Sequence, residues 1–370
     1  MFRFIKKGWY DIDVIETSPF PLHPNYIEAS RANIGNISFD EHGSLTGYTS
    51  GRAFPEDPSS DDPQAGLKLV WNYQYGFNAG DSETIHPFWW TYRNIKTGKA
   101  ERVLKFEWHF MNWMPRVMFD PKPAFGTNTA GIYRSGYSRV LEPFDLTDTQ
   151  LLIHRYKDDL RRDDAWLYLG FQRRVRRLAT GQRTDAFLGT DIMIEDSEGY
   201  NGRISDYNWE CGGTRNLLAP FYKHNEIELE PKAPNTPDGF KFAKNKGAGK
   251  WFPDVPWQLR KMHLLIGRPK DDNHPLSHRD IYLDAETMVM SMLHIWDKKG
   301  RFWKYQYISK SHSDFHHPLN KGAGVPVETM AGLVDEQSEH CTSLQFRSII
   351  NSGQNQPPVF SVQNMRKHGQ

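Results

Sequence analysis

Trp166-Leu-Tyr-Leu-Gly-Phe171 runs without a break into Gln172-Arg-Arg-Val-Arg-Arg177, and this stretch is the most informative part of the chain. Its first half alternates large apolar and aromatic residues at the spacing of a β-strand. Its second half carries four guanidinium groups. The pattern predicts a single strand that leaves a hydrophobic core and ends in a basic cluster.

Acidic residues follow this basic cluster a short way downstream, among them Asp191 and Glu195. Successive residues of a strand point to opposite faces, so Arg174 and Arg176 are expected to share one face of the sheet. Two interpretations are open for these arginines. They form a salt-bridged cluster with Asp191 and Glu195, or they form a polar mouth that binds phosphate or carboxylate groups, which suit guanidinium.

The arginine run, followed by Gly189-Thr190-Asp191 and Glu195-Asp196, resembles a family of unknown function, the outer-membrane lipoprotein-sorting-protein-like domains (DUF1329-type) of Gram-negative bacteria. That family is distantly related to the periplasmic lipoprotein carriers LolA and LolB. Further segments follow the family in the same order, and the chain departs from it at Gly170 and at residues 261–266. The matching segments are residues 51–55, 66–72, 207–209, 220–222, 279–284 and 296–300.

The resemblance implies a mainly β fold with some α: a strongly curved antiparallel sheet, a LolA/LolB-like half-barrel with a few helices on its concave face. It implies a periplasmic carrier or chaperone that binds a lipid, a lipidated protein or another apolar molecule in the half-barrel cavity. The implied partners are that ligand and an envelope transporter or outer-membrane protein. No cofactor is implied.

The composition independently favours an antiparallel β protein. The chain has 370 residues, enough for a large core, and 14% of them are aromatic, with 12 Trp, 29 Gly and 23 Pro. The formal net charge of +1 gives no global field that would attract nucleic acid. The two cysteines, Cys211 and Cys341, exclude a disulfide-rich scaffold and leave open whether they are bridged or free.

The location of the protein has two interpretations. The chain contains no apolar run of about eighteen residues, and its first ten residues lack the apolar region of a signal peptide. It is either a cytoplasmic protein or a periplasmic one whose leader is absent from this chain. The resemblance to an exported family favours the periplasm.

We expect three parts along the chain. Residues 1–66 are polar and predict an N-terminal arm with a short helix at 23–36, and residues 67–310 predict the β half-barrel domain. Residues 311–370 predict a polar segment that packs on or trails the domain, with a short helix at 327–336. The predicted strands include 103–111, 259–267, 288–296 and 302–308, and a hairpin pairs 151–156 with 166–175. The loop-like segment at 231–257 is predicted to be a flap.

Aromatic residues on the predicted strands either line a concave lipid cavity or fill a closed core, and periodicity does not separate the two. Strand 288–295 is apolar on both faces, which indicates a sheet covered on both sides. Residues 71–75 also read as an aromatic strand. The predicted wall residues are Trp108, Phe110, Trp166, Tyr168, Trp296 and Trp303.

No catalytic residue and no metal site is predicted. The main rival function is a hydrolase or lyase acting on an apolar substrate in the same cavity, for which His263 and His294 are the candidate titratable residues. A second rival is a scaffold subunit of an envelope export complex, for which exposed apolar patches would be the sign. The cluster His312, His316 and His317 lacks the spacing of a zinc motif.

Overall fold

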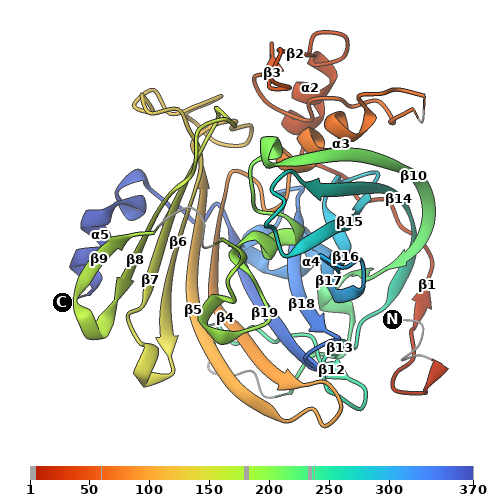
Figure 1. Ribbon diagram of the computed structural model, residues 1–370, viewed down its shortest axis with the longest axis vertical. Helices are drawn as coiled ribbons and strands as arrows, with labels where there is room; N and C mark the ends of the chain where they lie inside the picture. Colours follow the sequence, from red (N-terminus) through yellow and green to blue (C-terminus); the bar gives the residue numbers. More distant parts are fainter. Residues whose placement is uncertain (1–5, 60, 179–182, 232–235, 237, 370) are drawn as a thin grey trace.

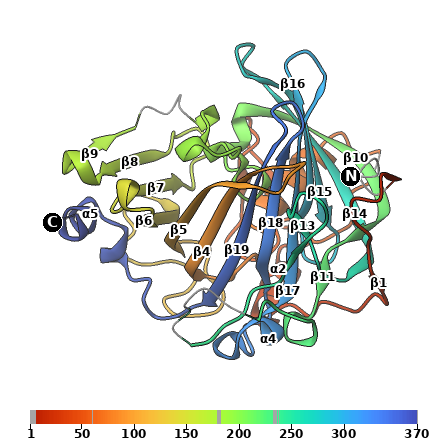
Figure 2. The same cartoon turned by 90° about the horizontal axis from the view of Figure 1, so that it is seen from below.

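The main element of the fold is one large, strongly curved sheet. The computed structural model describes residues 6–59, 61–178, 183–231, 236 and 238–369. The sheet has 15 strands, and its order is β1-β14-β15-β16-β17-β18-β19-β4-β5-β6-β7-β8-β9, with β10 paired to β14 and β11 to β17. Its two ends are not paired with each other, so it curls without closing (Figures 1 and 2). The predicted mainly β half-barrel is confirmed.

One half of the sheet is an antiparallel meander of consecutive strands. The predicted strand at 103–111 is confirmed, and it alternates because Phe106, Trp108 and Phe110 share one face. The pairing of residues 151–156 with the start of the next predicted strand is also confirmed. The strands are β4 (Ser82–Asn94), β5 (Ala100–Asn112), β6 (Ile132–Glu142), β7 (Gln150–Tyr156), β8 (Asp164–Leu169) and β9 (Arg174–Arg177).

The other half contains the predicted strands at 259–267, 288–296 and 302–308, all confirmed. The turn at Asp297 closes as expected, since its carbonyl accepts a hydrogen bond from the Gly300 N–H at 2.8 Å. The strands are β10 (Tyr207–Ala219), β11 (Phe221–Tyr222), β14 (Trp257–Pro269), β15 (Leu276–Asp284), β16 (Met290–Asp297), β17 (Phe302–His312), β18 (Pro326–Asp335) and β19 (His340–Ile350).

The helix predicted at 327–336 is wrong, because this segment is strand β18. All ten of its residues are buried. A strand buried on both faces shows no alternation of apolar and polar residues, so the strand signal was missing from the sequence. β18 and β19 lie between β17 and β4 and join the two halves of the sheet. Residues 311–370 therefore supply central strands, and the boundary expected at residue 310 falls inside the sheet.

The single strand predicted across residues 166–177 is also wrong. β8 ends at Leu169, a turn follows, and β9 runs back antiparallel with Arg174 opposite Leu169. A Cβ at Gly170 would come within 2.6 Å of the Thr147 carbonyl oxygen, so only glycine fits there. Arg173 then adopts φ 49°, which completes the reversal. The arginine run thus forms the edge strand of the sheet.

The aromatic strand expected at 71–75 is wrong as well, because these residues belong to the end of a helix. In α3 (Ala65–Gln74) the residues Leu69, Val70 and Trp71 are buried. Gly66 lets the helix lie against the backbone of β10 at Trp209, where a Cβ would collide. The predicted helix at 23–36 is confirmed as α2 (Pro24–Ala32).

Short elements complete the fold. β1 (Val14–Ile15) pairs in parallel with β14, which ties the N-terminal segment to the sheet. In the segment predicted as a flap, residues 232–235 and 237 lie outside the described residues, but Trp251 and Phe252 are fully buried. The remaining elements are β2 (Ser38–Phe39), β3 (Leu45–Thr46), β12 (Asn245–Lys246), β13 (Phe252–Pro253), α4 (Ser313–His316) and α5 (Val362–His368).

The two faces of the sheet are covered differently. The concave face of β4 to β7 packs against the end of α3 and the segment at residues 187–201. The opposite face of β5 to β8 packs against α5, where Leu152 and Met365 share a cluster with Met111. Within the described part of the chain, none of the helices has the length and apolar character needed to cross a membrane.

Candidate ligand cavity

A cavity opens on the concave face of the sheet. The volume of the cavity is about 140 Å³, and the non-atom space in and around it, open solvent included, is about 1360 Å³. The 3₁₀ turns η4 (Phe187–Gly189) and η5 (Ile194–Gly199) cover it together with the end of α3. Its apolar wall includes Ile85, Phe88, Trp90, Trp108, Phe110 and Phe346. A concave, largely apolar space with a few polar groups is the usual form of a small-molecule site.

The register of the strands aligns the wall residues in a row. Ile85 on β4 lies opposite Trp108 on β5, which lies opposite Ser138 on β6, which in turn lies opposite Leu151 on β7. In the next row, Gly136 is the small residue, and the Phe110 ring lies so close that a Cβ at residue 136 would approach it to 3.1 Å. The absence of a side chain at Gly136 therefore makes room for the Phe110 ring, which lines the cavity.

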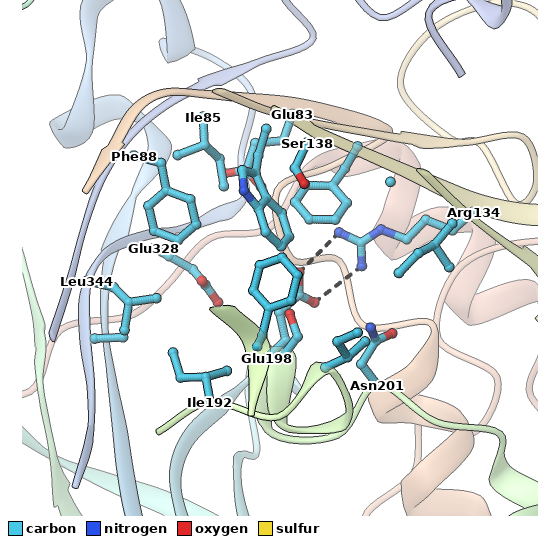
Figure 3. Close-up of a pocket in the computed structure, with 18 of the residues that line it drawn as sticks. Glu83, Ile85, Phe88, Arg134, Ser138, Ile192, Glu198, Asn201, Glu328 and Leu344 are labelled. Carbon is cyan, nitrogen blue, oxygen red and sulfur yellow. Dashed lines mark hydrogen bonds and ion pairs between the residues drawn. The ribbon is translucent and has the colours of Figure 1, made fainter. Parts of the chain in front are cut away.

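Two ion pairs involve residues that line the cavity, and Figure 3 shows the one between Arg134 and Glu198. Arg134 on β6 holds Glu198 on η5 through two hydrogen bonds of 3.2 Å. Lys310 on β17 donates to Glu328 on β18 at 2.7 Å. Burial alone would raise the pKa of Glu198, but the charge and hydrogen bonds of Arg134 hold this pKa below its usual value. These charges are therefore compensated inside the protein.

The covering segment is fixed to the helix as well as to the sheet. The Tyr73 hydroxyl on α3 donates to the Glu198 carbonyl oxygen and accepts from the Tyr200 N–H at 2.9 Å. Arg155 on β7, paired with Asp163, also donates to the Asn201 carbonyl oxygen at 2.9 Å. Hydrogen bonds thus tie the segment that covers the cavity to both α3 and β7.

Glu83 on β4 differs from the other acids of the cavity. Its side chain is 3% exposed, and its Oε1 atom has no hydrogen-bond partner in the described part of the chain. Burial, followed by the negative charge of Glu328, raises the pKa of Glu83 to about 8. At neutral pH this side chain is therefore a neutral carboxylic acid, which can both donate and accept a hydrogen bond.

The structure brings two of the six predicted wall residues into the cavity, Trp108 and Phe110. Trp166 and Tyr168 lie on the opposite face of the sheet, in the cluster covered by α5. Trp296 and Trp303 lie outside the lining as well. The Trp296 ring stacks on His278, and the Trp303 indole N–H donates to Asp335 at 2.8 Å.

The structure does not bring the predicted polar residues together. Arg174 and Arg176 are exposed on the edge strand β9 and do not line the cavity, whose guanidinium groups are those of Arg134 and Arg155. Asp191 accepts a hydrogen bond from Thr342 at 2.9 Å. Glu195 accepts one from Arg279 at 2.7 Å. A salt-bridged cluster of Arg174 and Arg176 with these acids is therefore not formed.

The histidines considered as candidates all lie outside the cavity lining. His263 Nδ1 is 2.8 Å from the Thr214 hydroxyl. His294 on β16 packs against the rings of Tyr282 and Tyr305 on the neighbouring strands. The histidine cluster at the end of β17 connects separate parts of the chain. His312 Nε2 is 2.9 Å from the Pro21 carbonyl oxygen, and His317 Nε2 is 2.8 Å from Asp238. The described residues contain no group of side chains arranged to hold a metal ion.

Both cysteines are free thiols, Cys341 in the core and Cys211 partly exposed. The two cysteines are therefore not bridged, a point that the sequence left open.

Sequence reasoning missed the polar residues of the cavity, namely Glu83, Arg134, Glu198 and Glu328. A signal for one of them was present on β6, where Arg134, Gly136 and Ser138, all small or polar, share one face of the strand. Small and polar residues on one face of an otherwise apolar strand indicate a face that looks into open space. The other three belong to separate elements, which no spacing along the sequence connects.

Comparison with known proteins gives one family and one fold. The profile of the family described as "protein of unknown function (DUF1329)" matches residues 1–366. An uncharacterized protein of Pseudomonas aeruginosa, PA3922, is 23% identical over 320 residues, which are 83% of this chain and 63% of that protein. The chain thus spans less than two thirds of that relative's length.

Two solved structures share the fold. A DUF1329 family protein from Desulfovibrio piger superposes with a TM-score of 0.56 at 15% identity, covering 84% of this chain and all of that one. A putative outer membrane lipoprotein-sorting protein domain from Vibrio parahaemolyticus gives 0.55 at 16% identity, covering 82% of this chain and all of that one.

Proposed function

The chain belongs to the DUF1329 family, as its sequence motifs predicted, and from this premise we propose that it is a carrier or chaperone for an apolar molecule. The ligand is a lipid, a lipidated polypeptide or another molecule with a long apolar part. The proposal includes a periplasmic location and an envelope transporter or outer-membrane protein as partner. The description of the Vibrio parahaemolyticus structure as a lipoprotein-sorting domain supports it.

The observation that carries the proposal is the cavity itself. Aromatic and aliphatic side chains of the concave face line a cavity of about 140 Å³ that they do not fill. Each methylene group moved from water into such a space contributes about 0.8 kcal/mol. A fully buried long acyl chain would then bind too tightly for a carrier to release it. We therefore expect partial burial of the ligand, or release when the segment at residues 187–201 opens.

A second candidate function is a hydrolase or lyase that uses the same cavity. The raised pKa of Glu83 favours it, because a shifted carboxyl group in a cavity is typical of acid–base catalysis. The lining, however, contains no histidine or cysteine in the part of the chain that the structure describes. An activated nucleophile of the serine–histidine or cysteine–histidine type is therefore not formed, and the carrier is the better supported function.

Replacing Ser138 with phenylalanine is expected to fill the cavity. Ser138 is buried between Trp108 and Leu151 in the wall, so a phenyl ring there occupies ligand space. The dissociation constant of the apolar fluorescent probe 1-N-phenylnaphthylamine is expected to rise at least about tenfold, the effect of losing a few methylene contacts. Fluorescence titration measures it.

The matched control is Leu152→Phe, which overpacks the opposite face of the sheet under α5 without touching the cavity. Thermal unfolding of both variants shows whether they fold. Unchanged probe binding by a folded Ser138→Phe protein would contradict the proposal that the cavity is the binding site.

A further inference from the structure

Two buried polar atoms of the cavity lining are not used by its charge pairs. Glu83 Oε1 and the Trp108 indole N–H both lack a hydrogen-bond partner in the described part of the chain, and both residues line the cavity. Glu83 lies opposite Phe110 in the register, and Ile85, two residues along, lies opposite Trp108. Glu83 and Trp108 are therefore diagonal neighbours on one face of the sheet.

Resting on the proposed carrier function, we propose that this site binds the uncharged, hydrogen-bonding end of an otherwise apolar ligand: a hydroxyl, ester or amide group. The neutral acid of Glu83 donates to the ligand oxygen, and the Trp108 indole N–H donates to the same group. A hydroxyl or amide hydrogen can in turn be donated to Glu83. Two buried polar atoms that would otherwise remain unsatisfied gain partners in this way.

An anionic end group fits this site poorly, because its cations are already engaged. Arg134 is held by Glu198 through two hydrogen bonds, and Lys310 is held by Glu328. Arg155 is held by Asp163 at 2.7 Å. A carboxylate or phosphate would have to break one of these pairs and leave a buried carboxylate without a partner, which is costly.

A cationic end group fits less well than a neutral one. An ammonium group would have to lose its hydration and would also require Glu83 to ionise beside the negative charges of Glu328 and Glu198. Arg134, the cation that faces this acid from β6, opposes the entry of a further positive charge. The uncharged end group avoids both costs.

The test is a displacement series on the full chain with one chain length and four end groups. Dodecanol, dodecanamide, dodecanoate and dodecylamine compete at pH 7 with bound 1-N-phenylnaphthylamine. Dodecanol and dodecanamide are expected to displace the probe at concentrations about tenfold lower than the two charged compounds, the effect of one buried hydrogen bond made or lost. Dodecanoate or dodecylamine as the best competitor would overturn the inference.

Two variants separate the hydrogen bond from mere packing. Glu83→Gln keeps a neutral donor and acceptor, so the order of the four competitors is expected to persist. Glu83→Leu removes both, and the advantage of dodecanol is expected to fall about tenfold. An advantage that survives in Glu83→Leu would overturn the role of Glu83.

A change of pH adds a second readout. Raising the pH from 7 to 9 ionises Glu83, so the affinity for methyl dodecanoate, an ester that can only accept a hydrogen bond, is expected to fall in the wild type and to stay level in Glu83→Gln. The groups that act on the pKa of this acid are the charges of Glu328, Glu198 and Arg134 and the hydroxyl of Ser348. An equal fall in both proteins would count against the inference.

Failure of the probe itself to bind would overturn the carrier function. Probe binding without the expected order of competitors would overturn the end-group inference alone.

Discussion

Replacing Arg279 with alanine is expected to lower the free energy of unfolding by about 3–5 kcal/mol, the usual cost of breaking a buried ion pair from one side. Arg279 on β15 is fully buried and donates to Glu195 at 2.7 Å and to the Gly199 carbonyl oxygen at 2.8 Å. It also lies 3.4 Å from Asp196. The variant would leave two buried carboxyl groups of η5 without this counter-charge.

The charge balance of this site explains the size of the effect. Burial alone would raise the pKa of Glu195, but hydrogen bonding to His274 and the charge of Arg279 hold this pKa at about 2. Without the arginine, Glu195 must either remain charged in the core or take up a proton. Both outcomes cost free energy, and both loosen the segment that covers the cavity.

Chemical denaturation followed by tryptophan fluorescence measures the change. Arg301→Ala is the matched control, because its ion pair with Asp297 lies at the surface, where the Arg301 side chain is 64% exposed. The control is expected to lose less than about 1 kcal/mol. Equal losses in the two variants would show that the buried arginine does not hold the core together.

The second large effect is a pH-dependent gain in stability on replacing Glu83 with glutamine. In the folded protein the pKa of Glu83 is raised from 4.5 to about 8, chiefly by burial. Below pH 4.5 both the folded and the unfolded chains hold this proton, so the group contributes nothing. Between pH 4.5 and 8 the unfolded chain releases the proton and the folded chain keeps it, so stability falls as the pH rises.

At pH 8 this loss amounts to at most about 4 kcal/mol, since each pKa unit corresponds to about 1.4 kcal/mol. Glu83→Gln has no proton to release. It is therefore expected to unfold at a higher temperature than the wild type at pH 8 and at a similar temperature at pH 4.5. Glu28→Gln, at an exposed position of α2, is the control.

Calorimetry at both pH values measures the difference. A Glu83→Gln protein whose advantage does not grow between pH 4.5 and pH 8 would show that Glu83 is not a buried neutral acid. It would also remove the donor on which the end-group inference depends.

Most strands could be predicted from the sequence, some from alternation and the one at 288–296 from an apolar run with no alternation. Strand 103–111 was predicted because Phe106, Trp108 and Phe110 alternate with polar residues. β18 was mistaken for a helix because both of its faces are buried. The turn at Gly170 was missed because its cause, the nearby Thr147 carbonyl, belongs to another hairpin.

The candidate site was harder to predict than the fold. Trp108 on β5 and Trp166 on β8 both alternate with neighbours in the sequence, yet one looks into the cavity and the other packs under α5. Periodicity identifies two faces but does not say which of them is concave. The ion pair between Arg134 and Glu198 joins β6 to η5, a contact that depends on the curvature of the whole sheet.

Native mass spectrometry of the protein purified from its own host, followed by organic extraction, tests the carrier function most directly. We expect an apolar molecule with an uncharged polar end to co-purify at close to one per chain. A protein that purifies without a bound apolar molecule and also fails to bind 1-N-phenylnaphthylamine would contradict the carrier function.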